Sequence, residues 1–299
     1  MSRPLAVVSV DVDPVDLHLV GYGHRGLAPD PSAYRIALPR LLAAFERAGV
    51  RATFFVVARD ADAQRDTLRS LVGSGHEVAS HSFSHPLPLA RLPEPQLRAE
   101  LEDSKRALEA ATGHEVVGFR APNWDVAPRV LDALARLGYR YDASVFPSLL
   151  LIPARALLAL KARDRLAVLS MQPWPMSLRR RPWRRITAAG SIAELPISVT
   201  PTAGFPVYHT TRYLVAEPTF LRQLDGFVTR REPFFYPLHA VDALGLAEDE
   251  VDPRLARHPG MERALDSKLA LIDNSLAAIA HRFEPVTYVE YLRREPLST

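Results

Sequence analysis

The 299-residue chain is predicted to fold as one α/β domain with the architecture of a β/α barrel. Two features of the sequence predict this class. Short runs of β-branched and aromatic residues alternate with amphipathic stretches of roughly ten to twenty residues, which is the pattern of βαβ units and a parallel sheet. In addition, no long Gly- or Ser-rich linker divides the chain. A single domain of this length can bury a sizeable core.

The first half of the chain supplies most of this alternation. The expected strands cover residues 5–10, 52–57, 76–80, 115–119 and 139–141. They are short apolar runs without polar alternation, as buried strands are. The expected helices cover residues 36–48, 63–72, 94–111 and 128–137. Gly49, Gly113 and Gly138 stand where helix-terminating glycines belong.

The second half continues the pattern after an interruption. Strands are expected at 191–199, 233–238 and 286–288, and a helix at 261–281. The total of roughly seven strands fits a β/α barrel, complete or incomplete, better than two domains. We therefore predict one domain over residues 1–299, with a basic, partly apolar insertion at about 148–190.

Composition restricts the chemistry. Apolar residues make up 47% of the chain and charged residues 24%, as in soluble globular proteins. Cysteine is absent, so any metal must be held by His, Asp or Glu. The apolar run before Asp11 has six residues, which is too short for the core of a signal peptide, and a cytoplasmic location is expected.

Charge is concentrated in one segment. Between Arg155 and Arg185 there are nine basic residues and a single acid, Asp164. The whole chain has a net charge of only +3, so the protein is not uniformly basic. This distribution argues against a general nucleic-acid binder.

Titratable or cationic residues follow five of the expected strands. They are Asp11 and Asp13 after the first strand, His81 and His85 after the third, and then Arg120, Asp142 and His239 after later ones. Active sites of β/α barrels are built at the carboxyl ends of the strands. Because such residues follow five strands, the sequence predicts a functional site at the carboxyl ends of the strands.

The spacing of His81 and His85 is compatible with a metal site but does not require one. Histidines four positions apart meet on one helix face, and a tight loop also brings two imidazoles together. With Asp13 they make three protein ligands and leave open positions for water and substrate, as a hydrolytic metal requires. Zn²⁺ suits this set best, and Ni²⁺, Co²⁺ or Mn²⁺ also fit.

The two aspartates need different roles. Two close carboxylates repel each other unless a cation intervenes. A metal held by Asp13 leaves Asp11 free to take a proton from the attacking water. Arg120 is expected to orient Asp11 through a bidentate pair, and His239 to protonate the leaving group.

Five ordered stretches resemble the motifs of one known family. They read SVDVDP, HSFSHP, FRAPNW, YDASVFP and YPLHAVD, and they resemble the polysaccharide deacetylase (NodB-homology) family. The resemblance implies a distorted (β/α)7 barrel and metal-dependent hydrolysis of an N-acetyl, O-acetyl or N-formyl group on a sugar. It implies the same roles for the residues above and adds Asp142 as the acid of the fourth motif. Alternatively, Asp142 caps the turn that follows it.

The first motif departs from the commonest form of the family. Val12 separates the two aspartates, and this D-x-D form resembles a branch with cytoplasmic sugar deacetylases and deformylases. We therefore expect a hydrolase that removes an N-acetyl or N-formyl group from a lipid- or nucleotide-linked amino sugar, through metal-activated water. The alternative is an inactive glycan- or lipid-binding module on the same barrel.

Other aromatic and histidine residues have less context. Trp124 and Phe146 are expected either to line a sugar subsite or to serve as ordinary core residues. Six histidines fall outside the motifs and are predicted to have no special role: His18, His24, His114, His209, His258 and His281.

The segment 149–185 allows three interpretations. The apolar stretch 149–160 is too short to span a bilayer. With Trp174, Trp183 and the arginines of 179–185, it fits a peripheral contact with an anionic membrane, at the inner face for a cytoplasmic protein. It also fits a barrel-covering helix with a solvated basic loop, or a site for an anionic substrate.

Overall fold

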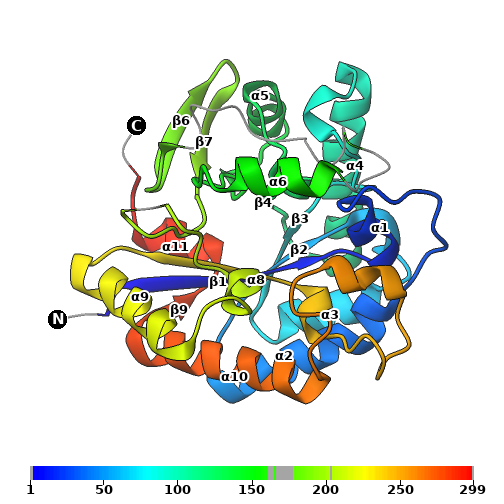
Figure 1. Cartoon of the computed structure of the whole chain (residues 1–299). Helices are drawn as coiled ribbons and strands as arrows, with labels where there is room; N and C mark the ends of the chain where they lie inside the picture. The colour runs from blue at the N-terminus through cyan, green and yellow to red at the C-terminus, as the bar shows by residue number, and fades with distance from the viewer. Residues whose placement is uncertain (1–2, 161–164, 166–177, 203, 298–299) are drawn as a thin grey trace.

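The protein is built around one curled sheet with helices on its outside (Figure 1). The computed structural model describes residues 3–160, 165, 178–202 and 204–297. Within them the strands are β1 Leu5–Val12, β2 Thr53–Val56, β3 Glu77–Ser80, β4 Gly118–Phe119, β5 Tyr141–Asp142, β6 Trp183–Thr187, β7 Gly190–Glu194, β8 Phe234–His239 and β9 Glu284–Val286. Their order in the sheet is β6-β7-β5-β4-β3-β2-β1-β8, and β9 also pairs with β1.

The helices connect the strands and cover the sheet. They are α1 Val15–Val20, α2 Leu38–Ala48, α3 Arg65–Gly73, α4 Glu94–Thr112, α5 Pro128–Arg136, α6 Leu151–Leu160, α8 His209–Arg212, α9 Glu217–Arg230, α10 Leu265–Arg282 and α11 Tyr288–Arg294. Shorter helical turns include η1 Ala33–Ala37, η4 Pro122–Trp124, η6 Ala240–Ala243 and η7 Pro253–Arg257. Figure 1 shows α2 and α10 side by side on one flank of the sheet and α6 on another.

Strand β1 explains how the sequence places a polar site inside the barrel. Side chains alternate between the two faces of a strand. Leu5 and Val7 belong to the apolar cluster inside the curled sheet, whereas the even-numbered residues from Ala6 to Val12 contact the outer helices. Ser9 and Asp11 continue the inward series. The inner face of β1 thus changes from apolar to polar toward its carboxyl end.

The predicted α/β architecture is confirmed, in the form of an open, curled mixed sheet. Neighbouring strands are parallel except β6, which runs antiparallel to β7. The gap between the β7 side and β8 is bridged by an irregular segment. There the backbone N–H of Ser198 donates to Phe235 O at 3.3 Å, and Phe235 N–H donates to Ser198 Oγ at 2.9 Å. These bonds complete the wall of the barrel without a continuous ladder.

Several elements differ from the sequence expectation. Strand β7 ends at Glu194 instead of 199, because the chain leaves the ladder to reach β8. Strands β4 and β5 have two residues each, and Tyr288 begins α11 instead of ending a strand. The glycines at 49 and 113 end their helices in the left-handed conformation (φ 64° and 76°), as expected.

The segment expected to be an insertion contains α6 and β6. Residues 152, 156, 157 and 160 of α6 are exposed, and all four are apolar. Trp183 is buried at the start of β6 beneath the guanidinium of Arg179, so this side chain does not take part in the membrane contact that was one of the three interpretations. Trp174, Lys161 and Arg163 lie outside the described residues. Among the described helices, none has the length and apolar character that crossing a membrane requires.

Candidate active site

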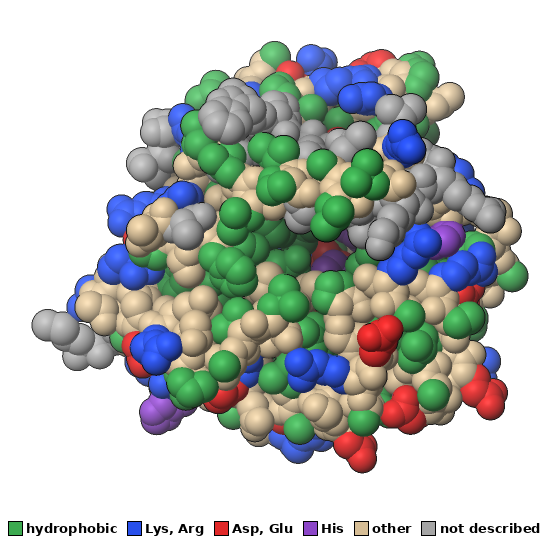
Figure 2. Space-filling model, viewed as in Figure 1, with side chains coloured by type: hydrophobic (Ala, Val, Ile, Leu, Met, Phe, Trp, Pro, Cys, Tyr) green, Lys and Arg blue, Asp and Glu red, His purple; other side chains and the backbone are tan. Residues whose placement is uncertain are grey.

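A cavity of about 290 Å³ opens at the carboxyl ends of the central strands. Figure 2 shows a hollow beside α6 with acidic and histidine side chains at its bottom. The acids and imidazoles that line the cavity are Asp11, Asp13, His18, His81, His85, His239 and His258. The aromatic side chains that line it are Tyr22, Trp124, Phe146 and Tyr208. Its size lies near the lower end of the range for small-molecule sites, about 300–1,000 Å³.

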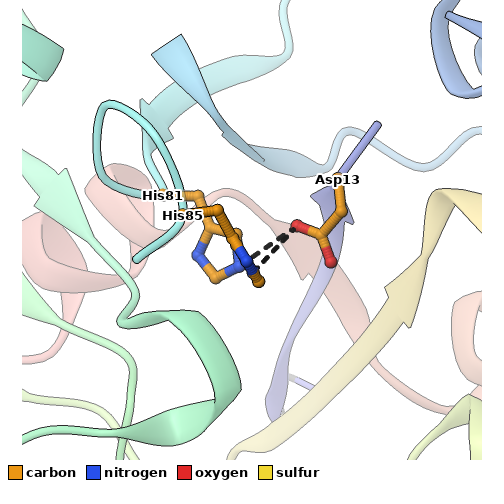
Figure 3. A group of neighbouring side chains, drawn as sticks. All are labelled: Asp13, His81 and His85. Carbon is orange, nitrogen blue, oxygen red and sulfur yellow. Dashed lines mark ion pairs between the residues drawn. The ribbon is translucent and has the colours of Figure 1, made fainter. Parts of the chain in front are cut away.

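Asp13, His81 and His85 converge at the bottom of this cavity (Figure 3). Nε2 of His81 is 3.3 Å and Nε2 of His85 is 3.7 Å from Asp13 Oδ1. One donor atom from each of the three residues lies within 4.8 Å of the others. All three side chains are at least nine-tenths buried. The structure therefore brings together the three predicted ligands.

The two histidines meet through a tight loop and not through a helix face. Ser82 and His85 both have positive φ (65° and 58°), a conformation that non-glycine residues rarely adopt. Ser82 Oγ accepts a hydrogen bond from His85 N–H at 3.1 Å, which closes the turn. Glu100 on α4 accepts from the N–H groups of Phe83 and Ser84 and fixes the loop against the helix. The spacing of His81 and His85 is thus a product of loop geometry.

The electrostatics of this group favour a bound cation. Burial raises the pKa of Asp13, but the imidazoles of His85 and His81 outweigh it and hold the pKa well below its usual range. Burial lowers the pKa of His85 to about 4, so its ring is neutral and offers a lone pair. Burial lowers the pKa of His81, but Asp13, Asp11 and the hydrogen bond to Arg120 together outweigh it and raise the pKa above its ordinary value.

Hydrogen bonding shows that the three residues fit a metal. Nδ1–H of His81 donates to the backbone carbonyl of Arg120 at 2.6 Å, so the neutral ring, the form that binds a metal, has its lone pair on Nε2. That lone pair faces Asp13 Oδ1, a buried oxygen that accepts no hydrogen bond from any described residue. Lone pairs on converging nitrogen and oxygen atoms repel unless a cation lies among them. His₂Asp is also a donor set that Zn²⁺ and similar ions accept.

Asp11 lies next to this group and is paired with a fully buried arginine. Nη1 of Arg120 donates to Asp11 Oδ1 at 2.5 Å and to Ser9 Oγ at 3.1 Å. Nη2 donates to the hydroxyl of Tyr288 at 3.0 Å, and Nε to Ala143 O at 3.0 Å. The expected bidentate pair is wrong, because the other guanidinium nitrogens are committed elsewhere. Arg120 still orients Asp11 from behind, without lining the cavity.

His239 stands on the other side of Asp11, at the end of β8. The two residues are register partners across the β1–β8 pair, and His239 Nε2 is 3.9 Å from Asp11 Oδ2. Burial lowers the pKa of His239, and the carboxylates of Asp11 and Asp242 only partly offset this effect. A protonated ring with a lowered pKa is a stronger acid, which suits a residue that protonates a leaving group.

The remaining predicted residues divide into two groups. Trp124 and Phe146 line the cavity and also contact each other edge to face, with ring centroids 5.4 Å apart. Asp142 does not line the cavity, because it is fully buried and accepts from Ser144 N–H and Oγ at 3.0 and 2.5 Å. These bonds are those of a turn cap, the alternative that the sequence left open.

Sequence reasoning missed several residues of the cavity wall. His18 and His258 were expected to have no special role, but both line the cavity, and His18 Nδ1 is 3.2 Å from Asp13 Oδ2. Asp242, three residues after His239, bonds His258 Nε2 at 3.2 Å. The position of His18 just after the first strand was a usable signal. His258 follows no strand and has no such signal in the sequence.

Comparisons with known proteins agree with this geometry. Residues 31–141 match the family model described as polysaccharide deacetylase. A peptidoglycan deacetylase from Helicobacter pylori is 30% identical over 145 residues, which cover 47% of this chain and 49% of that protein. The chain thus aligns with about half the length of this curated relative. The match to the family model includes His81, His85 and Arg120, whereas Asp11, Asp13 and His239 lie outside it.

Solved structures support the fold. A Mycobacterium smegmatis protein assigned as a polysaccharide deacetylase superimposes with a TM-score of 0.57 at 19% identity, over 95% of this chain and 93% of that one. A 4-alpha-glucanotransferase from Thermococcus litoralis superimposes with a TM-score of 0.61 at 15% identity, over 99% of this chain and 41% of that one. Since one of the two is a transferase, the shared fold does not fix the reaction.

Proposed function

We propose that this chain, whose residues 31–141 match the polysaccharide deacetylase family model, hydrolyses the N-acyl group of an amino sugar. The observation that carries the proposal is the convergence of Asp13, His81 and His85 beside Asp11 and His239 in one cavity. A ligand set open to the cavity, flanked by a carboxylate and an imidazole, is the arrangement that amide hydrolysis needs.

Each side chain has a role in this proposal. A divalent ion held by Asp13, His81 and His85 would supply Lewis acidity for the water and for the acyl carbonyl. Asp11 accepts the proton of the attacking water, and the hydrogen bond from Arg120 holds Asp11 in orientation. His239 donates a proton to the departing sugar nitrogen. Zn²⁺ is our first choice of ion, with Ni²⁺, Co²⁺ and Mn²⁺ as alternatives.

We further propose an acetyl or formyl substrate on a lipid- or nucleotide-linked sugar. Both carriers join the sugar through phosphate, and the exposed Arg257 lines the cavity where such a group would lie. Arginine is well suited to phosphate recognition. The aromatic side chains of Trp124 and Phe146 offer faces for the apolar side of a sugar ring. The peptidoglycan deacetylase among the relatives makes an acylated sugar polymer the alternative substrate.

A peripheral contact with an anionic membrane is part of the same proposal. The exposed residues that the structure describes on α6 are Ile152, Pro153, Ala156, Leu157 and Leu160. All of them are apolar, whereas the exposed positions of a surface helix are normally polar. Hydrophobic side chains gather over α6 next to the hollow (Figure 2). The exposed Arg179, Arg180 and Arg181 add positive charge after it in the chain. The cytoplasmic location expected from the sequence stays a prediction, with the inner membrane face as the surface contacted.

One experiment tests the activity and the carrier together. Acetate and formate release should be measured with zinc-loaded protein on lipid-linked, nucleotide-linked and polymeric N-acyl amino sugars. We expect release from at least one phosphate-linked sugar and less from neutral polymer. Preferential release from the polymer would overturn the proposed carrier. Binding without release from any substrate would favour the inactive glycan- or lipid-binding module.

A further inference from the structure

A chain of polar side-chain contacts leaves the candidate metal site from the second oxygen of Asp13. Oδ1 of this carboxylate faces His81 and His85, whereas Oδ2 lies 3.2 Å from Nδ1 of His18. Nε2 of His18 lies 3.2 Å from Nδ1 of His258. Because a carboxylate only accepts hydrogen bonds, the contact with Asp13 requires Nδ1–H of His18 as donor.

This series of side-chain contacts ends at the carboxylate of Asp242, which also bonds the backbone of His239, the candidate general acid. Nε2–H of His258 donates to Asp242 Oδ1 at 3.2 Å. Oδ2 of Asp242 accepts from the backbone N–H of His239 at 2.8 Å. Tyr22 reaches Nδ1 of His258 with its hydroxyl at 3.1 Å. Each of these contacts orients the next side chain in the chain.

All members of the chain are shielded from solvent. His18 is 7% exposed, His258 is 2% exposed and Asp242 is fully buried. Buried side chains in contact have little room for another arrangement, and the rings of His18 and His258 also pack edge to face with centroids 5.0 Å apart. His18 does not belong to the group of donor atoms within 4.8 Å of one another, and among the three candidate ligands its hydrogen-bond contact is with Asp13. Its ring also lies edge to face with that of His239, with centroids 5.4 Å apart.

We propose that His18 is a positioning residue for the metal site and that His258 and Asp242 hold His18 in place. The hydrogen bond to Oδ2 fixes the carboxylate so that Oδ1 points at His81 and His85. Through Asp242, the same chain holds the backbone of His239. The metal ligands and the candidate acid, which come from opposite ends of the sequence, therefore share one support. The proposal rests on the metal site of the proposed function but not on any substrate or turnover.

Two substitutions of His18 distinguish the contribution of its Nδ1 from that of its Nε2. Asparagine places its amide where Nδ1 lies and keeps a donor for Asp13, whereas glutamine reaches the position of Nε2 and keeps only the contact with His258. Zn²⁺ affinity should be measured by competition with a chelator, without substrate. We expect His18→Gln to weaken binding by roughly 10–100-fold, as loss of an outer partner of a metal ligand does. We expect His18→Asn to stay within about threefold of the unsubstituted protein.

Three results would overturn this assignment. Equal affinity in both variants and the parent protein would show that His18 does not position Asp13. A larger loss in His18→Asn than in His18→Gln would show that the contact with His258 matters and the contact with Asp13 does not. If the Co²⁺ absorption spectrum of His18→Asn shifts and binding is lost, His18 is a ligand. The thermal unfolding of each metal-free variant serves as the folding control.

A double-mutant cycle tests whether His258 acts through His18. His258→Ala should weaken Zn²⁺ binding by roughly 3–10-fold in the parent protein and have no further effect when His18→Ala is already present. Equal losses in both backgrounds would show that His258 acts by another route. These affinities do not depend on turnover. If the Zn²⁺ affinities follow the expected order but no substrate is hydrolysed, only the proposed activity is overturned. Absence of any metal binding in the parent protein would overturn both.

Discussion

The floor of the cavity consists of strand ends and of loops pinned to them, whereas its rim consists of connecting segments such as α6. We use floor for Asp11, Asp13, His81, His85 and His239, and rim for the exposed face of α6 with Trp124, Phe146 and Arg257. The floor residues lie close to charged or polar partners, and all of them are buried except His239, which is partly exposed. The exposed α6 residues have apolar side chains facing solvent.

This difference assigns different tasks to the two regions. Several floor residues are oriented by buried partners, as Asp11 is by the guanidinium of Arg120 and His81 by the backbone carbonyl of Arg120. Such a site suits chemistry, which needs fixed geometry. The rim combines aromatic, apolar and cationic side chains without fixed partners for its apolar face, which suits recognition of a carrier. Substitutions in the floor should therefore change turnover, and substitutions in the rim should change binding.

The largest effect is expected from His81→Ala in the floor. Two remaining ligands hold a divalent ion poorly, so bound metal and turnover should be lost together. Elemental analysis of the zinc-reloaded protein and acetate or formate release measure the two. His114→Ala, an exposed histidine away from the cavity, is the matched control. Metal retained at the parent level would exclude His81 as a ligand.

Asp11→Asn should remove the proposed base without affecting metal binding. The variant keeps all three ligands, so metal content should stay unchanged. Turnover should fall by roughly two to four orders of magnitude, as expected for loss of a positioned base. Steady-state kinetics with the best substrate of the panel measures the loss. A rate near that of the parent protein would remove Asp11 from the mechanism.

The three arginines that follow α6 in the chain are not part of the rim but belong to the same proposed membrane contact. The triple variant Arg179→Gln, Arg180→Gln and Arg181→Gln should bind anionic liposomes about 100-fold more weakly. Each cation near an anionic surface contributes on the order of 1 kcal/mol, and the effect should shrink with added salt. Co-sedimentation with vesicles of anionic and of neutral lipid measures it. A second triple, Arg47→Gln, Arg98→Gln and Arg106→Gln, makes the same charge change on α2 and α4 and should bind like the parent.

The apolar part of the rim needs its own test. Leu157→Ser with Leu160→Ser alters two exposed side chains of α6 (65% and 70% exposed) and should weaken vesicle binding without changing turnover of a short soluble substrate. Leu214→Ser, at a site that is 74% exposed and outside α6, is the control. If the α6 variant binds vesicles normally but changes the oligomeric state, the exposed face covers a second copy of the chain instead.

Arg257→Gln tests the part of the rim assigned to the carrier. A charged hydrogen bond to phosphate at an exposed position is worth about 1.4 kcal/mol, or tenfold. KM for a phosphate-linked sugar should therefore rise roughly tenfold at constant kcat. KM for a neutral N-acyl oligosaccharide should not change. An equal rise in KM for both substrates would mean that Arg257 shapes the cavity without binding phosphate.

The smallest effect is expected behind the floor, where Asp142 and Glu194 face each other across β5 and β7. Burial, reinforced by Asp142, raises the pKa of Glu194 well above its usual value, and burial raises the pKa of Asp142 to about 6. In this pH range the folded protein keeps a proton on the carboxyl group, whereas the unfolded chain has released it. The free energy of unfolding therefore falls as pH rises from the pKa of the unfolded state toward that of the folded state. Each pH unit in that window costs about 1.4 kcal/mol per group.

Glu194→Gln removes this proton linkage and should leave turnover nearly unchanged. Its melting temperature should exceed that of the parent protein by a margin that grows from pH 5 to pH 8. Thermal unfolding at several pH values gives this margin, and the exposed Glu115→Gln should show no such trend. A large loss of turnover in the glutamine variant would place this carboxyl pair within the floor.

The sequence alone determined the fold class and most of the floor. Alternating apolar runs and amphipathic helices encode strands and helices locally, and the two-residue repeat of β1 puts Asp11 on the same face as Leu5 and Val7. In a parallel sheet the carboxyl ends lie together, so polar residues after successive strands must converge. That is why Asp13, His81 and His85 could be predicted as one group.

Only the tertiary structure decided which other groups complete the site. His18 and His258 are 240 residues apart and meet because α1 and the segment after η7 are brought to the same side of β1. Arg120 pairs with Asp11 through one nitrogen because Ser9, Ala143 and Tyr288 take the other donors. Trp183 is buried although Arg179, Arg180 and Arg181, a few residues before it, are exposed. Local patterns specify the face on which a side chain lies, whereas its partners depend on the register and curvature of the whole sheet, which no short stretch of sequence encodes.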